Sequence, residues 1–186
     1  MAEGLAMSHA YDVSAWHDFA TGLASASAAL TGLVLVAVSI HLREVLADPI
    51  HRLRAASAFV SLVALLGFAL VALFAGISRQ AYGSVVVAVA LVRLIHSARD
   101  ARLFVGEPGS EGRLTLLAHL VSSAAELWGG IGLLVRIGGG MYVLAAGLLL
   151  HAGIALRVVW FIFVSISEED AEFSQEDVHP PAAGGM

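Results

Sequence analysis

Some ionisable side chains lie inside long apolar runs of this sequence, where a charge is costly unless it is paired or used. Four of them are weighed first as candidates for chemistry: His119, Glu126, His151 and Arg157. Within a bilayer such residues are rare and mark charge pairs, proton relays or ion pathways. For Glu126 the sequence leaves three readings open: an ion pair that fixes helix register, a relay for protons or ions, and a protonated carboxyl hydrogen-bonded to a neighbour.

The partner of Glu126 can be narrowed by depth along the chain. The apolar runs on either side of Gly138 turn back on each other, which at 1.5 Å per helical residue puts Glu126 about 18 Å from that turn. His151 lies at a similar depth, and Arg157 lies about 9 Å deeper. Depth along the helices therefore favours His151 as the partner of Glu126. Arginine is long, however, and leans towards the N-terminal end of its helix and so towards Glu126. If Arg157 does not reach Glu126, its side chain extends to the nearby inner interface between membrane and water.

Three histidines, His41, His96 and His119, are expected near the same end of three different helices. Imidazoles at similar depth could bind haem or a metal ion. No HxxxH or HExxH spacing accompanies them, and ordinary interfacial histidines explain the same pattern. The sequence therefore predicts no metal site and no cofactor, with haem kept as an alternative.

The first apolar run carries small and polar residues along one face, mostly at steps of three and four. Small residues let helices approach closely in lipid, whereas hydroxyls and small side chains also line narrow pores. The stripe therefore fits either a packing seam within or between subunits, or the lining of a pore built by several copies. Its members are Asp18, Thr21, Gly22, Ser25, Ala28, Ala29, Gly32 and Ser39. In the pore reading, Asp18 lies at the outer mouth and favours cations.

The elements that must position these residues are membrane-spanning helices. The chain is 59% hydrophobic and 13% charged, with a mean hydropathy of +0.85, whereas soluble domains are about 45–50% apolar and about 25% charged. A bilayer core needs about 20 apolar residues in a helix. Five runs predict an all-α transmembrane bundle over residues 14–166, with spans at 14–42, 55–77, 81–97, 114–137 and 139–166. The third run contains Arg93 and is the shortest, so a four-span bundle is the alternative.

Arginine placement orients the predicted bundle. All ten basic residues are arginine, and arginine concentrates on the cytoplasmic side of membrane proteins. The loops after the first and third runs are rich in arginine, which puts the N-terminus outside and the C-terminus inside. Residues 1–13 then form a short outer segment, and 167–186 form an acidic cytoplasmic tail that we expect to be disordered. Aromatic residues agree with this orientation, because Tyr11, Trp16, Tyr82 and Tyr142 fall at the expected outer boundary.

Several segments of the N-terminal half carry a family resemblance. They are residues 11–19 (YDVSAWHDF), 28–33 (AALTGL), 36–40 (VAVSI) and 51–55 (HRLRA), continuing to Tyr82 and Gly83. With these segments the chain resembles a group of small multi-span membrane proteins from actinobacteria. The resemblance implies a multi-pass protein of the bacterial cytoplasmic (inner) membrane, and it supplies no active-site residue.

The sequence favours a homo-oligomeric conduit for an ion or small polar solute over catalysis. The absence of cysteine excludes thiolate chemistry and Cys-ligated metals. No G-x-S-x-G or comparable motif predicts a catalytic residue, and no basic patch predicts nucleic-acid binding. The alternatives are a non-catalytic accessory subunit of a larger membrane complex, with the stripe as its docking surface, and a haem- or quinone-binding redox subunit.

Overall fold

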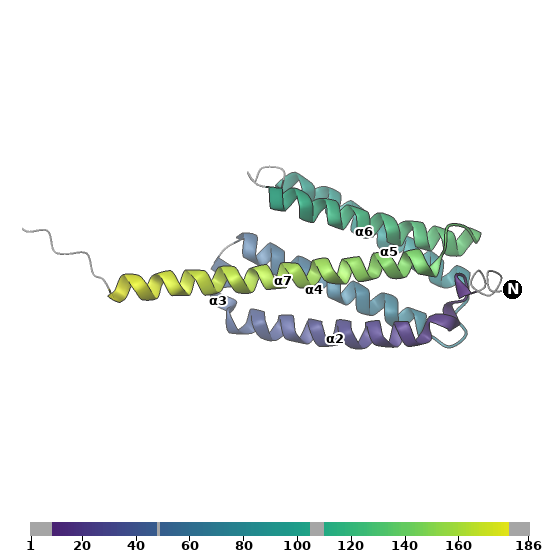
Figure 1. Cartoon of the computed structure of the whole chain (residues 1–186), viewed down its shortest axis with the longest axis horizontal. Coiled ribbons are helices and arrows are strands. Elements are labelled where there is room, and N and C mark those ends of the chain that lie inside the picture. Colours follow the sequence, from purple (N-terminus) through teal and green to yellow (C-terminus); the bar gives the residue numbers. More distant parts are fainter. Residues whose placement is uncertain (1–8, 48, 105–109, 179–186) are drawn as a thin grey trace, which may run out of the picture.

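The computed structural model describes residues 9–47, 49–104 and 110–178 and has the form of an elongated bundle of antiparallel helices (Figure 1). All of its elements in these ranges are helical, so the all-α prediction is confirmed. In chain order they are η1 (Val13–Trp16), α2 (His17–Ile40), α3 (Leu42–Ala47), α4 (Pro49–Ala72), α5 (Arg79–Phe104), α6 (Ser110–Val135) and α7 (Met141–Val178).

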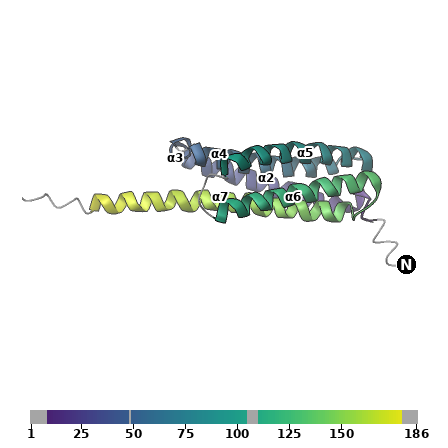
Figure 2. The same ribbon diagram turned by 90° about the horizontal axis from the view of Figure 1, so that it is seen from above.

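The long helices form two groups that α7 joins. Helix α2 packs along α4, helix α5 packs along α6, and α7 lies against both α6 and α4. Although α4 and α5 are consecutive in the sequence, they pack mainly on different neighbours. Both views show that α7 extends well beyond the other helices at one end (Figures 1 and 2).

The antiparallel course gathers arginines at one end of the bundle. The start of α2, the α4–α5 loop and the α6–α7 turn lie at the end nearest the N-terminus, on the right in Figure 1. We call this the N-terminal end; it carries Arg79 and Arg136. We call the opposite end, where α3 lies, the arginine-rich end. Its helix segments and connections contain Arg43, Arg52, Arg54, Arg99, Arg102 and Arg113.

Three helices of the described chain are long and apolar enough to cross a membrane. The qualifying segments are Val13–Ile40, Ala55–Ala72 and Leu116–Val135, and α7 adds the shorter apolar stretch Met141–Arg157. Large apolar side chains also point outward from every long helix, and examples are Leu35, Val60, Val92, Val121 and Leu149. Such an exterior is compatible with a membrane protein, because lipid tails accept apolar surface as readily as a protein core does.

Two helical segments differ from the sequence expectation. Residues 167–178, expected to be disordered, continue α7 as helix. This stretch contains neither glycine nor proline, the residues that most disfavour a helix interior. The short helix α3 was not anticipated either. The remainder of the tail, 179–186, and residues 1–8 lie outside the described ranges.

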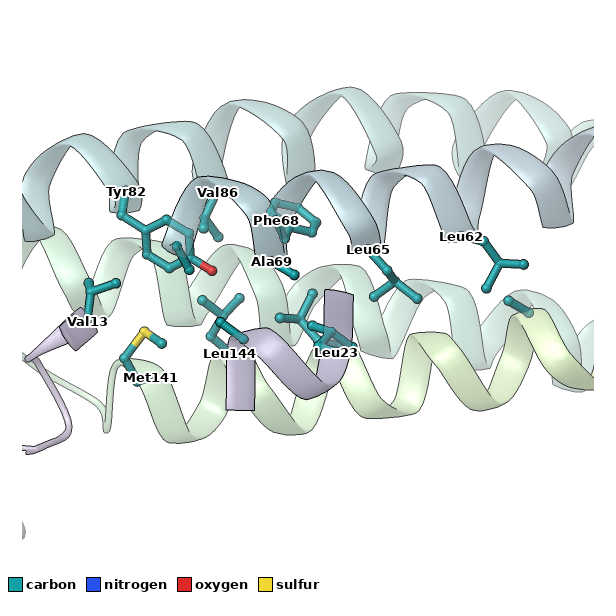
Figure 3. Close-up of a cluster of buried hydrophobic side chains, with 14 of the residues drawn as sticks. Val13, Leu23, Leu62, Leu65, Phe68, Ala69, Tyr82, Val86, Met141 and Leu144 are labelled. Atoms are coloured by element: carbon teal, nitrogen blue, oxygen red, sulfur yellow. The ribbon is translucent and has the colours of Figure 1, made fainter. Parts of the chain in front are cut away.

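Tyr82 is a core residue and not the interfacial ring that its position predicted. It lies near the start of α5 but is only 2% exposed, and Figure 3 shows its ring in the buried cluster with Val86 and Met141. The other aromatic residues of this end stay nearer the surface. There, the Trp16 ring packs edge-on against Tyr142 with their centroids 4.8 Å apart.

The segment before α2 is fastened to the α6–α7 turn. The Ala10 carbonyl accepts a hydrogen bond from the Met141 amide at 2.8 Å. Gly140 has φ +42°, and a Cβ there would lie 2.4 Å from the same carbonyl, so only glycine fits. Asp12 begins η1 by accepting hydrogen bonds from the Ser14 hydroxyl and amide, which lower the pKa of this carboxyl.

Glycines bring α6 close to both of its neighbours. A Cβ at Gly129 would lie 2.7 Å from the backbone nitrogen of Leu144 on α7. A Cβ at Gly130 would lie 2.9 Å from the Val86 side chain on α5. In lipid such close backbone approach is a main source of helix association. The tight seams of this bundle are therefore α5–α6 and α6–α7.

Gly129→Ala is expected to lower stability by about 1–3 kcal/mol, the usual cost of overpacking a tight contact. The backbone of Leu144 cannot move aside as a side-chain tip would. Thermal unfolding of the detergent-solubilised protein measures the loss. The matched control is Gly67→Ala on α4, where a Cβ meets nothing within 4 Å. Equal stability of the two variants would contradict the assignment of the α6–α7 seam.

Candidate functional site

Three side chains from three helices meet in the interior of the bundle. Arg93 of α5 donates a hydrogen bond from Nη1 to Oε2 of Glu126 on α6. The Arg93 Nη2 atom lies 2.9 Å from Nε2 of His151 on α7, and Nδ1 of His151 lies 3.1 Å from Glu126 Oε1. Glu126 and His151 are 0% exposed, and the Arg93 side chain is 13% exposed. We call this closed set of three hydrogen bonds the Arg–Glu–His ring.

The ring depends on a glycine that makes room for the carboxylate. A Cβ at Gly147 would lie 3.1 Å from the Glu126 backbone nitrogen and 3.3 Å from its Cγ. Gly147 and His151 are one turn apart and so share a face of α7. Because α7 approaches α6 closely at Gly147, the imidazole of His151, one turn farther along α7, reaches the carboxylate of Glu126.

The ring lies near mid-depth of the bundle. At 1.5 Å per residue, Glu126 is about 14 Å from the end of α6 at Val135, and His151 is about 15 Å from the start of α7 at Met141. A bilayer core is about 30 Å thick. Arg93 begins slightly farther from the N-terminal end, and its side chain leans back towards that end. If these helices cross a membrane, the ring therefore occupies its centre.

The geometry of the ring selects one protonation state. An arginine guanidinium only donates hydrogen bonds, so the facing Nε2 of His151 must be the unprotonated acceptor. The proton of the neutral imidazole is then on Nδ1, from which it is donated to an ionised Glu126. One cation, one anion and one neutral imidazole leave the ring without net charge. That balance matters because an uncompensated charge is expensive in this setting.

A further set of polar groups on α6 leads from the ring towards the arginine-rich end. Ser122 and Ser123, one turn before Glu126, are both fully buried. The Ser122 hydroxyl donates to the backbone oxygen of His119 at 3.2 Å. The Ser123 hydroxyl has no hydrogen-bond partner among the described residues. His119 follows on the same face, about 10 Å from Glu126 along the helix axis.

The contact between Glu126 and His151 is the one that depth favoured. Arg157 is instead exposed on the surface of α7. Sequence reasoning missed Arg93 as a partner, because it noted this residue only as a charge in the third and shortest run. The same depth arithmetic, applied to α5, contained the signal. Arg93 is about 21 Å from the start of α5 at Arg79, a few residues deeper than the other two members, and its long side chain leans back towards them.

Of the three histidines considered for haem, His41 and His119 lie on different parts of the bundle. His41 follows α2, which packs on α4, whereas His119 is on α6, which packs on α5 and α7. The side chain of His96 lies outside the described part of the structure. Among the described residues no group of three His, Cys, Asp or Glu side chains is arranged to hold a metal ion.

The small-residue stripe of α2 faces away from the bundle. Its residues, Asp18, Thr21, Gly22, Ser25, Ala28, Ala29, Gly32 and Ser39, are all exposed, while Ala20, Leu23, Ser27 and Val34 of the same helix are buried. A Cβ at Gly22 or Gly32 would meet nothing within 4 Å. The stripe is therefore not a packing seam within the subunit. We call this surface the outer face of α2.

Comparison with known proteins adds no relative: no family model, no curated protein and no solved structure matches this chain.

Removing one member of the ring is expected to be far more damaging than removing two. Glu126→Leu removes the carboxylate that pairs with Arg93, so the guanidinium must remain without a counter-charge or leave the interior, at a cost of about 3–5 kcal/mol. The double variant Arg93→Leu with Glu126→Leu restores most of that stability, because no uncompensated charge remains. Reversible unfolding of the wild type, the single variants Arg93→Leu and Glu126→Leu and the double variant in detergent gives the coupling energy. Arg157→Leu, at an exposed position, is the control for loss of a guanidinium. Additive losses in the double variant would contradict a coupled ring.

Proposed function

We propose that all five long helices cross a bilayer, with the N-terminal end outside and the arginine-rich end in the cytoplasm. The antiparallel course of the helices supports this, because it separates the arginine-poor turns from the arginine-rich connections. The Arg–Glu–His ring supports the inclusion of α5, since it neutralises Arg93 at mid-depth. By the family resemblance, the membrane is the bacterial cytoplasmic membrane.

Within that membrane we propose a homo-oligomeric conduit for an ion or a small polar solute. The observation that carries this proposal is the outer face of α2, where Asp18, Thr21 and Ser25 are exposed on the outside of a single subunit. Small side chains there favour close approach of another helix. Several copies arranged around α2 would enclose hydroxyls and backbone carbonyls along a path, with Asp18 near its outer mouth attracting cations.

The second candidate is an accessory subunit that docks on another membrane protein through the same face. The hydroxyls of Thr21, Ser25 and Ser39 favour it, because each donates to the backbone carbonyl one turn earlier, at 2.9, 2.9 and 2.7 Å. Hydroxyls satisfied in this way suit a packed interface as well as a pore. The redox alternative has less support, since His41 and His119 lie on helices with different neighbours.

Labelling of single cysteines tests the crossing number, and the cysteine-free chain makes such variants clean. A membrane-impermeant maleimide should label the exposed variants Ala15→Cys and Ser78→Cys in intact cells. It should label Leu46→Cys, and a cysteine added after Met186, only after lysis. Labelling of the added C-terminal cysteine in intact cells would contradict five crossings and favour four.

Planar-bilayer recording tests the conduit. The purified wild-type oligomer is expected to give discrete cation currents, and Ser25→Leu is expected to abolish them because a bulky side chain prevents close approach at the outer face of α2. Ser84→Leu is the matched control, since Ser84 is equally exposed but lies on α5. Silence of a wild-type oligomer across pH and cation type would contradict the conduit. A wild-type monomer in mild detergent, captured in fixed ratio by another membrane protein, would favour the accessory subunit.

A further inference from the structure

Among the described residues, the Arg–Glu–His ring is the buried charged cluster that uptake of a proton would disrupt. Protonation of His151 at Nε2 would set an N–H against the N–H of Arg93 and give the ring a net positive charge. Such a charge is unfavourable at mid-membrane. The ring therefore cannot take up a proton and keep all three members in place.

We propose that Glu126 is a mid-membrane proton-binding site, at which a proton and the Arg93 guanidinium alternate as the partner of the carboxylate. This site belongs to each subunit, between α5, α6 and α7. It does not rest on the conduit proposed at the outer face of α2.

Arg93 is the member of the ring that can leave. Its side chain is 13% exposed, whereas Glu126 and His151 are fully buried. Arg93 also belongs to α5, which packs along α6. Its hydrogen bond to His151 therefore joins α5 to α7, a helix against which α5 does not mainly pack. A freed arginine side chain can extend along apolar surface and so carry its charge out of the interior of the bundle.

The proton transfer balances atom by atom through the imidazole. When Arg93 leaves, a hydronium ion gives a proton to the vacated Nε2 of His151 and is left as water, and the proton on Nδ1 passes along its hydrogen bond to Oε1 of Glu126. One O–H bond of hydronium and the Nδ1–H bond break, and one Nε2–H bond and one O–H bond of the carboxylic acid form. The products are a neutral carboxylic acid that donates to Nδ1 and a neutral imidazole with its proton on Nε2. The positive charge has moved with Arg93.

The groups around the ring limit where the proton enters. Beside Arg93, helix α5 contributes Tyr82 towards the N-terminal end, and α6 contributes His119 towards the arginine-rich end. Helix α4, on the other side of α7, offers the apolar Leu62, Leu65 and Phe68. The unpartnered hydroxyl of Ser123 lies between Glu126 and His119 along α6, where a transient water would find a donor and acceptor. These groups favour entry from the arginine-rich end, past His119.

Infrared spectroscopy of the whole protein in nanodiscs tests the proton-binding site directly. Acidification of the wild-type protein should produce a carboxylic-acid carbonyl band that Glu126→Gln lacks. Arg93→Gln, without the competing cation, should show that band already at neutral pH. Arg157→Gln is the matched control for loss of a guanidinium and should behave as wild type. Ser25→Leu should also keep the band, even if it abolishes conduction, which separates this proposal from the conduit.

Distances between spin labels test the departure of Arg93. Loss of the hydrogen bond between Arg93 and His151 removes the direct link between α5 and α7 and lets these helices move relative to each other. Labels on Ile95→Cys of α5 and Leu156→Cys of α7, both about half exposed, should therefore show one separation at alkaline pH and a second population at acid pH. Glu126→Gln, which mimics the protonated acid, should show the second population at every pH. If the wild-type acid band does not appear, or if the distances do not respond to pH or to Glu126→Gln, the ring is a static clasp and the proposal is wrong.

Discussion

A charge-balanced ring of hydrogen bonds between Arg93, Glu126 and His151 is the constraint on which the interior of this bundle depends. Between apolar helices in lipid there is little hydrophobic preference for one register over another. An ionised carboxylate at mid-depth removes that freedom, because every other register leaves a charge without its partner. The ring also links α5 to α7, which otherwise meet mainly through α6. Three helices are thereby fixed by one interaction.

The glycine seams and the ring depend on each other. Gly129 and Gly147 bring the backbones of α6 and α7 close enough for a short imidazole to reach a carboxylate. Gly130 does the same for α5, where Val86 and Val87 fill the space that a side chain at this position would take. Dispersion contacts along these seams are individually weak but numerous. The seams therefore supply attraction, and the ring selects the one alignment in which that attraction is combined with satisfied polar groups.

The sequence contained much of this arrangement but not all of it. Long apolar runs predicted the helices, because a run of such length has few other stable forms in lipid. Depth along two antiparallel helices was enough to favour His151 as the neighbour of Glu126, since that argument needs only the rise per residue. Arg93 was missed because it was noted only as a charge in the shortest run, although its long side chain could reach the depth of Glu126. The helical continuation of α7 was missed because acidic composition was given more weight than the lack of glycine and proline.

The errors that remain share a physical cause. In a soluble helix, hydrophobic periodicity tells which face is buried. These helices are apolar on all sides, so periodicity does not fix their rotation about the helix axis. Tyr82 was therefore placed at the interface although it faces the core, and the stripe of α2 could equally have faced inward. The rotation of each helix about its axis is set instead by glycines that allow close contact with a neighbouring helix, as at Gly147. It is also set by charged side chains that must reach their partners, as Glu126 reaches His151. On α2 no glycine and no charged residue faces inward, because Gly22, Gly32 and Asp18 are all exposed. The residues of the stripe are left on the outside, where only contact with another helix would bury them.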